Sequence, residues 1–440
     1  MILVDRQGYE KKSKDELIDE IEEMLNENDR LKRELRKYKN PNTPPSAHPF
    51  LKPVMPLRSS SKKRGAPVGH PGSNRTWNPD ADECHIMASE CPNCHSNDLR
   101  VIRTARQQID EIPPEIKPVT TTVERDVCEC NTCHLQFVAR DEKTPLKGRF
   151  GVNLMVLVIL LRFIVRGVMR KTASFLGASF ALQLAPASVQ AIISRAAQAG
   201  AKEYDQLKER IRAAPRLHID ETSFSVLGKN WWVWVFRSEI DKLLVIRHSR
   251  GNNVLEEILG KNYAGIVHCD CWRAYDFLSN AILQRCWAHL LRKSAELNVT
   301  VAGRHFHDKL STLFDEIKAF NKKNPAMKQR AKKYDTLTVR MRKITRYYAR
   351  YNDCTAVVKY LNFHIGSWFT CVKFNNVEPT NNLAEQAIRE TVIVRKIIGA
   401  FRSEHGPETY ETLASLLATW QSQQKNIRQE LHRMLTAQLC

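Results

Sequence analysis

The sequence predicts a multidomain α/β protein: small N-terminal modules, a helical module, and a larger domain built on a mixed β-sheet with a helical insertion. Three observations predict it. The chain has 440 residues, which is too long for one small core. Strand-like apolar runs follow Arg216, whereas helical periodicity dominates before them. Two CxxC spacings mark a separate small module nearer the N-terminus.

The formal net charge is +20, which favours a polyanionic partner such as nucleic acid. A soluble basic protein without such a partner, or one that binds a membrane surface, is the alternative. The longest apolar run, Leu154 to Val165, is interrupted by Arg162 and is too short to span a bilayer. The N-terminus has no signal-peptide pattern, so we expect a cytosolic protein.

Residues 13–39 are predicted to form a coiled-coil helix. Ser13 and Glu16 have the spacing of a capping box. Core-type positions then recur at alternating steps of four and three residues, at Leu17, Ile21, Met24, Asn28, Leu31, Leu35 and Tyr38. The Asn in this seam favours a parallel homodimer or higher oligomer, and a single amphipathic helix packed on its own chain is the alternative.

Residues 40–80 are predicted to form a basic linker rich in Pro, Ser and Gly. The stretch from Pro41 to Pro79 has no acidic residue. The cluster Lys62, Lys63 and Arg64 is suited to DNA phosphates, although a flexible basic segment can also contact nothing in particular.

Residues 81–145 are predicted to form a zinc ribbon. Cys91 and Cys94 make one knuckle, and Cys130 and Cys133 make the other. Four thiolates can close a tetrahedral Zn²⁺ site that leaves no position for water, so the ion would be structural. Reduced cysteines without metal are the alternative, and Cys84 or Cys128 could replace one of the four.

Residues 150–212 are predicted to form a helical module that resembles a DNA-binding unit. A turn near Ala185 and Pro186 separates two helical stretches, in the order of a helix-turn-helix. Ordinary helix packing explains the same apolar pattern, and the spacing alone does not decide between the two.

Residues 213–402 are predicted to contain the mixed sheet. Three strand-like runs, a helical stretch and a fourth strand-like run follow in order. Asp220 falls within or at the end of the first strand and Asp270 at the tip of the fourth, so both can meet at one sheet edge. An acid among apolar strand residues is costly to bury unless it is paired or binds metal.

Hard oxygen ligands select Mg²⁺ or Mn²⁺, and a pair of such ions suits phosphodiester chemistry. Glu385 is the third carboxylate that we expect, because it follows capping-type Asn residues at the start of a predicted helix. Arg389 lies one turn further on the same face, where it can contact a phosphate or neutralise Glu385.

These motifs together resemble the transposase family of insertion sequence 66. The resemblance covers nearly the whole chain and rests on the leucine-zipper helix, KKRGAPVGHPG, the cysteine ribbon, LHIDET, HCDCWRAY, RCWAHLLRK, NNLAEQAIR and RKIIGAFRSEHG. One departure is Cys271-Trp272, where the family often has Gly-Tyr. The resemblance implies a ribonuclease-H-like catalytic core with a DDE triad at Asp220, Asp270 and Glu385, and Zn²⁺ at the four cysteines.

Several further groups are expected to be accessory or DNA-binding, namely His289, Arg292, Arg389, Arg395 and Lys396. A packed structural role is the alternative for His289. A helical insertion at about 290–375 carries many Lys and Arg between Lys318 and Arg350, with Asp335 as the sole acid there. This stretch suits transposon-end DNA, or else is a solvated basic helix. A helical tail is expected at 403–440.

The resemblance implies a transposase, nucleoid-associated in the cytoplasm of a prokaryotic cell, that uses Mg²⁺ or Mn²⁺ to cleave and join DNA. Its partners would be transposon ends, target DNA, further copies of the chain and accessory transposition proteins. Two alternatives remain open: a DNA-binding repressor or decayed copy that no longer cuts, and a nuclease that hydrolyses without joining.

Overall fold

The computed structural model describes Met24, Glu27 and residues 79–80, 84–109, 117–141 and 143–439. Apart from Met24, Glu27 and the last two linker residues, the predicted coiled coil and the linker with Lys62, Lys63 and Arg64 lie outside the described residues. The chain divides into two compact units, Met1–Pro118 and Val119–Cys440. Each is considered by itself below.

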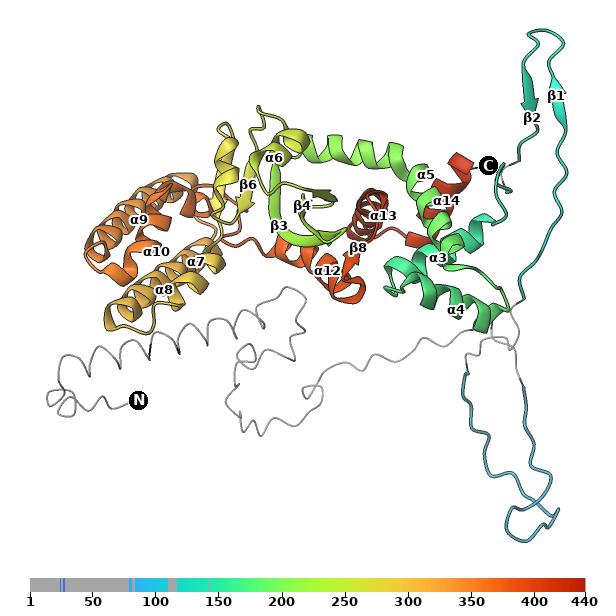
Figure 1. Ribbon diagram of the computed structural model, residues 1–440. Coiled ribbons are helices and arrows are strands. Elements are labelled where there is room, and N and C mark those ends of the chain that lie inside the picture. Colours follow the sequence, from blue (N-terminus) through green and yellow to red (C-terminus); the bar gives the residue numbers. More distant parts are fainter. Residues whose placement is uncertain are drawn as a thin grey trace. The chain divides into compact units, whose positions relative to one another are not determined.

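The second unit contains a six-stranded sheet with β5, β4, β3, β6 and β7 in that order, and β8 pairs with β3 (Figure 1). The bounds are β3 Arg216–Val226, β4 Lys229–Arg237, β5 Lys242–Arg247, β6 Ile266–Cys269, β7 Ile282–Arg285 and β8 Ala400–Phe401. The β3–β4 and β4–β5 pairs are antiparallel, whereas β6 runs parallel to both β3 and β7. The predicted mixed sheet is confirmed, with helix α6 (Asn252–Leu259) between β5 and β6.

Alternation along the strands gives the sheet two apolar faces. On β4, Trp234 and Phe236 pack into a core with α6 and the second half of α5 (Pro186–Ala213). Val233 and Val235 face the opposite way, toward α12 (Asn382–Ile398) and α13 (His405–Ser422). Both faces are therefore covered by helices, as a mixed sheet of this kind requires.

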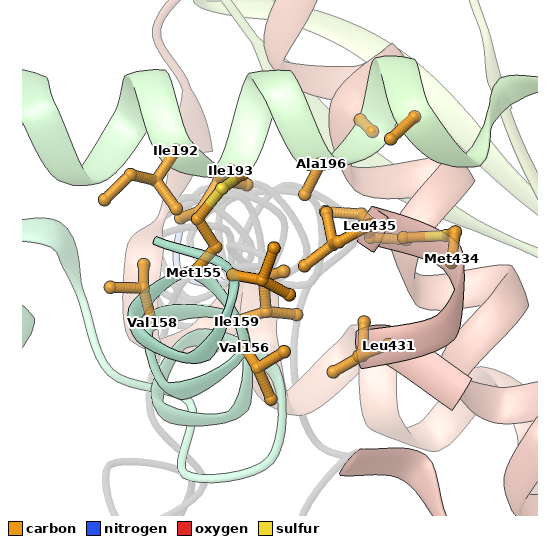
Figure 2. Close-up of a cluster of buried hydrophobic side chains, with 14 of the residues drawn as sticks. Met155, Val156, Val158, Ile159, Ile192, Ile193, Ala196, Leu431, Met434 and Leu435 are labelled. Carbon is orange, nitrogen blue, oxygen red and sulfur yellow. The ribbon is translucent and has the colours of Figure 1, made fainter. Parts of the chain in front are cut away.

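The predicted helical module contains α3 (Val152–Phe163), α4 (Met169–Phe180) and the first half of α5, which begins at Pro186 as expected. Its core is shared with α14 (Ile427–Leu439), because Leu431, Met434 and Leu435 lie against α3 and α5 (Figure 2). The segment expected as a tail thus packs within the fold: α13 lies along β5 and α14 closes the helical module.

The insertion forms a helical group of its own at the β6–β7 side of the sheet (Figure 1). Its elements are α7 Trp287–Ala295, α8 Val301–Lys322, α9 Met327–Tyr348, η3 Asn352–Cys354, α10 Thr355–Asn362, η4 Ile365–Trp368 and α11 Thr370–Lys373. Trp287 and Trp368 are buried in its core, with their rings 6.0 Å apart. None of the helices in the described ranges combines the length and the apolar character that a membrane span requires.

Candidate active site

Strand register places the two aspartates side by side. His218 of β3 is paired with His268 of the parallel strand β6. The β3–β6 pairing ends there, and Asp220 and Asp270, the first residue after β6, each lie two residues further on; the charge of Asp270 helps to raise the pKa of Asp220, so the two carboxylates lie near one another. Because both aspartates are two residues beyond the paired histidines, both project to the same face of the sheet. The predicted meeting of the two acids is thereby explained by pairing of β3 with β6.

Asn381 fixes the start of α12 against this edge. Its side chain is fully buried, and its Nδ2 donates to the Ile219 carbonyl oxygen at 2.7 Å. Its Oδ1 must then accept, so the Nδ1 of His218, 3.2 Å away, carries the proton. Asn381 occupies the N-cap position of α12, where a capping-type Asn was expected, but its side chain makes no capping bond, because β3 takes its amide.

Glu385 lies in the first turn of α12, as predicted, with a half-buried side chain. Its Oε1 is 3.0 Å from Nη2 of Arg292 and 3.5 Å from Nδ1 of His289, both on α7. The carboxylate is therefore turned toward α7. The oxygens of Asp220, Asp270 and Glu385 are not all within 4.8 Å of one another.

Asp220 is a half-buried acid that lies near other acids. Burial, followed by the charges of Glu221, Asp270 and Glu385, raises the pKa of Asp220 to about 7. Its Oδ1 accepts the backbone N–H of Glu221 at 3.0 Å, which opposes the rise only in part. Asp270 accepts the backbone N–H of Trp272 at 2.7 Å.

The two histidines next to the aspartates supply no positive charge at neutral pH. His218 and His268 stack with ring centroids 3.8 Å apart. Burial lowers the pKa of His218 to about 4, and burial together with His218 lowers the pKa of His268 to about 3. The aspartates must therefore obtain any counter-charge from another source.

Glu221 occupies the opposite face of β3 and has partners of its own. Its Oε1 is 2.8 Å from Nη2 of Arg250, and Tyr275 donates its hydroxyl to Oε2 at 2.6 Å. The Arg250 guanidinium in turn lies over Trp272, 4.2 Å from the ring centroid. Burial and Asp270 raise the pKa of Glu221, while Tyr275 and Arg250 oppose that rise.

The remaining predicted side chains fall into two groups. Arg292, Arg389 and Lys396 are exposed, and His289 is half-buried beside Glu385. Arg395 is instead held against β3, where it donates to the Ser223 carbonyl oxygen and reaches the Thr222 hydroxyl at 3.3 Å. Its guanidinium anchors α12 to the sheet.

The Lys and Arg side chains of the insertion's basic stretch fall into two groups, those that are buried or paired and those that are exposed. Arg330 is buried and donates to the carbonyl oxygens of Val372 and Phe374 at 3.2 and 3.4 Å. Lys333 and Arg340 pair with Glu316. The exposed cations that remain on α9 are Lys328, Lys332, Arg342, Lys343 and Arg346. These side chains extend their charge into solvent, away from the insertion's core.

The knuckle in the first unit is a tight turn. The Cys91 amide donates to the Ser96 carbonyl oxygen at 2.9 Å, and the His95 amide donates back to the Cys91 carbonyl oxygen at 2.9 Å. The backbone N–H groups of Asn93 and Cys94 lower the pKa of Cys91. The turn therefore stabilises a thiolate at this position.

The knuckle in the second unit has the same local geometry, within the hairpin of β1 (Val127–Glu129) and β2 (Gln136–Val138). The Cys130 amide donates to the Leu135 carbonyl oxygen at 3.0 Å and the His134 amide to that of Cys130 at 2.8 Å. Hydrogen bonds from the backbone N–H groups of Cys133 and Thr132 lower the pKa of Cys130 to about 7.

The sequence analysis did not predict that His218 and His268 pair across β3 and β6, although the sequence contains a pattern that indicates it. His218-Ile-Asp220 and His268-Cys-Asp270 share the pattern His-x-Asp, which marks two strands with equivalent register. It also missed the ion pair of Glu221 with Arg250, which joins two segments that are distant in the sequence. The sequence pattern indicates Asn381 as a helix-start residue and gives no sign of its burial against β3.

Two comparisons relate this chain to known proteins. A 250-residue stretch is 23% identical to "Uncharacterized protein y4qI" of Sinorhizobium fredii (strain NBRC 101917 / NGR234), covering 49% of this chain and 46% of that protein. The chain thus spans about half the length of that curated relative. The profile of the Transposase IS66 family matches residues 147–409, from the helical module through α12 and into α13. The chain belongs to the transposase IS66 family.

Proposed function

We propose that this transposase cleaves DNA at the ends of an insertion sequence and joins them to target DNA, with Asp220, Asp270 and Glu385 as the catalytic carboxylates. The observation that carries the proposal is the pairing of β3 with β6, which brings Asp220 and Asp270 to one face. Asn381 holds the start of the Glu385 helix against the same strand.

The proposal includes a ribonuclease-H-like core. In its support, three antiparallel strands are followed by two parallel ones in the order β5–β4–β3–β6–β7, with a helix before the fourth strand. The first acid lies on the central strand, the second follows the adjacent strand, and the third begins a later helix. Fold alone does not assign chemistry, so the carboxylates carry the argument.

The residues fit Mg²⁺ or Mn²⁺. Asp220 is a half-buried acid whose neighbours are acids and neutral histidines, and carboxylate oxygens are the ligands that these ions prefer. When bound, such ions supply an activated water or 3′-hydroxyl and stabilise the leaving oxygen of the phosphodiester.

The chain's own groups have distinct tasks in this proposal. Asp220 holds the rigid side of the site, since it lies within the paired strand β3, and Asp270 lies beside it, one residue after β6. Glu385 is the carboxylate that can change partner. Its present partner Arg292 is exposed and can bind a DNA phosphate in place of the Glu385 carboxylate. The exposed cations of α9, with Arg389 and Lys396, would bind the backbone of the transposon end.

The test is cleavage and joining of labelled transposon-end DNA in Mg²⁺ by the full chain, beside Asp270→Ala and Glu385→Gln. We expect both variants to bind DNA and to lose both reactions. Glu239→Gln is the matched control, since Glu239 is an exposed acid in the turn after β4.

Binding without cleavage by the unmodified chain, at every divalent ion tested, would favour a repressor or decayed copy. Cleavage without joining would favour a hydrolytic nuclease. Cleavage that survives in Asp270→Ala would remove the carboxylate assignment itself.

Two further expectations belong to the same proposal. Each cysteine knuckle would contribute two thiolates to structural Zn²⁺, consistent with the lowered pKa of Cys91 and Cys130. The N-terminal heptads would join copies of the chain on DNA. Metal analysis of the purified protein and its mass in solution test them separately.

A further inference from the structure

A second set of ligand-type side chains lies beside the carboxylates. The sulfur of Cys286, a ring nitrogen of His289 and a carboxylate oxygen of Glu385 all lie within 4.8 Å of one another. Across the described ranges no other group of three His, Cys, Asp or Glu side chains meets that limit. We propose that these three residues bind a thiophilic divalent ion such as Zn²⁺, and that the bound ion withdraws Glu385 from the proposed catalytic site.

The fold holds the three ligands in place before any ion arrives. Cys286 immediately precedes α7 and His289 follows three residues later, so both lie on one face of the helix's first turn. The backbone N–H of Asn381 donates to the Cys286 sulfur at 3.2 Å, and the Cys286 amide donates to the Cys269 carbonyl oxygen at 2.9 Å. Glu385 comes from the first turn of α12, one turn beyond Asn381.

The ring nitrogen Nδ1 of His289 lacks a hydrogen-bond partner among the described residues, and a bound ion would serve as its partner instead. Its Nδ1 is buried and makes no hydrogen bond to the described residues, although Oε1 of Glu385 lies 3.5 Å away. Buried ring nitrogens normally have a partner. Because the His289 and Glu385 side chains are each about three-tenths exposed, an ion can reach the group from solvent.

The ligand atoms of Cys286, His289 and Glu385 favour a different ion than the three carboxylates do. One thiolate, one imidazole and one carboxylate suit Zn²⁺ or Co²⁺ and leave a fourth position for water, whereas Mg²⁺ prefers oxygen ligands alone. Binding releases the Cys286 thiol proton to water. It also displaces Arg292 from Glu385, which is feasible because the Arg292 side chain is 62% exposed.

The primary test is titration of the full chain with Co²⁺ alone, read by thiolate-to-cobalt charge-transfer absorption. The cysteine knuckles add the same thiolate-to-cobalt absorption in every variant. The quantity measured is therefore the difference in absorption between each variant and the unmodified chain. Cys286→Ser should lose the absorption of one ion per chain, and His289→Gln should weaken that ion's affinity by about 10- to 100-fold. Cys354→Ser, at a buried cysteine in the insertion, should change neither.

Arg292→Gln provides a test that does not depend on replacing a buried residue. Removing this competing cation should tighten Co²⁺ binding. A flat difference spectrum for Cys286→Ser in a folded protein, or unchanged affinity in Arg292→Gln, would overturn the site.

Withdrawal of Glu385 rests on the proposed function and is measured separately. Zn²⁺ added to the Mg²⁺-dependent cleavage reaction should inhibit the unmodified chain at lower concentration than it inhibits Cys286→Ser, each relative to its own basal rate. Equal inhibition would overturn the withdrawal of Glu385. Absence of Mg²⁺-dependent cleavage would instead contradict the proposed function, and the cobalt result would stand independently.

Discussion

Asp220 and Glu221 are consecutive acids on one strand, yet their surroundings are opposite. Glu221 faces an arginine and a tyrosine hydroxyl, at 2.8 and 2.6 Å. Burial, followed by the charges of Glu221, Asp270 and Glu385, raises the pKa of Asp220 to about 7, and the one backbone N–H that it accepts opposes this rise only in part. Strand alternation alone separates the two environments.

The difference distinguishes a structural acid from a candidate metal ligand. A buried carboxylate that has an arginine partner has its charge balanced without an ion, and removing either partner destabilises the folded chain. A buried carboxylate among like charges is destabilising until a cation arrives. The environment on each side of β3, more than the residue type, therefore indicates which acid serves chemistry.

The largest expected effect is on catalysis. Asp220→Asn should lower Mg²⁺-dependent strand cleavage by more than about 100-fold, since even outer-shell partners of metal ligands contribute about 10- to 100-fold. Glu221→Gln should retain cleavage within about 10-fold, because the amide still accepts the Tyr275 hydroxyl. Equal losses in the two variants, measured on one labelled substrate, would break the comparison.

The next effect is on stability and has the opposite pattern. Glu221→Ala should lower the free energy of unfolding by about 3 kcal/mol, because the buried Tyr275 hydroxyl and Arg250 lose their acceptor. Asp220→Asn should leave it unchanged or higher in metal-free buffer. Urea denaturation measures both, with the exposed Glu239→Ala as control; destabilisation of the Asp220→Asn variant as large as that of Glu221→Ala would count against the account.

A smaller effect appears in the pH dependence of stability. Because folding raises the pKa of Asp220 from 3.8 to about 7, the folded chain binds more protons than the unfolded chain between these values. The free energy of unfolding should therefore fall as pH rises through this window, by at most about 1.4 kcal/mol per pH unit from this group. Subtracting the Asp220→Asn curve isolates the contribution, and parallel curves would contradict it.

The smallest expected effect is on DNA binding by α9, where exposed cations can be compared with cations that have an acidic partner. Replacing the exposed Arg342 or Lys332 by Gln should weaken DNA binding and reduce the dependence of log affinity on log salt concentration by about 1 for each DNA phosphate that is no longer neutralised. Arg340→Gln, whose partner is Glu316, should change the slope less. Binding measured at several salt concentrations separates the two classes.

Much of the sheet could be predicted because its signals are local. The apolar alternation of β3 to β5 and the acids after apolar runs are visible in short windows of sequence, so Asp220 and Asp270 can be identified without any knowledge of contacts. Glu385 can be identified because the start of a helix also has a local signature.

The remaining features depend on segments that are far apart in the chain. Nothing near Arg395 indicates that it donates to the Ser223 carbonyl oxygen of β3, and nothing near Asn381 indicates that its amide bonds Ile219. Likewise α5 appears as one amphipathic helix, although its first half packs in the helical module and its second half against the sheet. Such roles are set by tertiary packing, which local patterns do not record.

The measurement that tests the central claim most directly is Mn²⁺ binding by electron paramagnetic resonance to the full chain, Asp220→Asn and Glu221→Gln. We expect the unmodified chain and Glu221→Gln to bind Mn²⁺ with similar affinity, and Asp220→Asn to lose that binding while remaining folded. Undiminished binding in Asp220→Asn, or loss confined to Glu221→Gln, would contradict the assignment of Asp220 as a metal-binding catalytic residue.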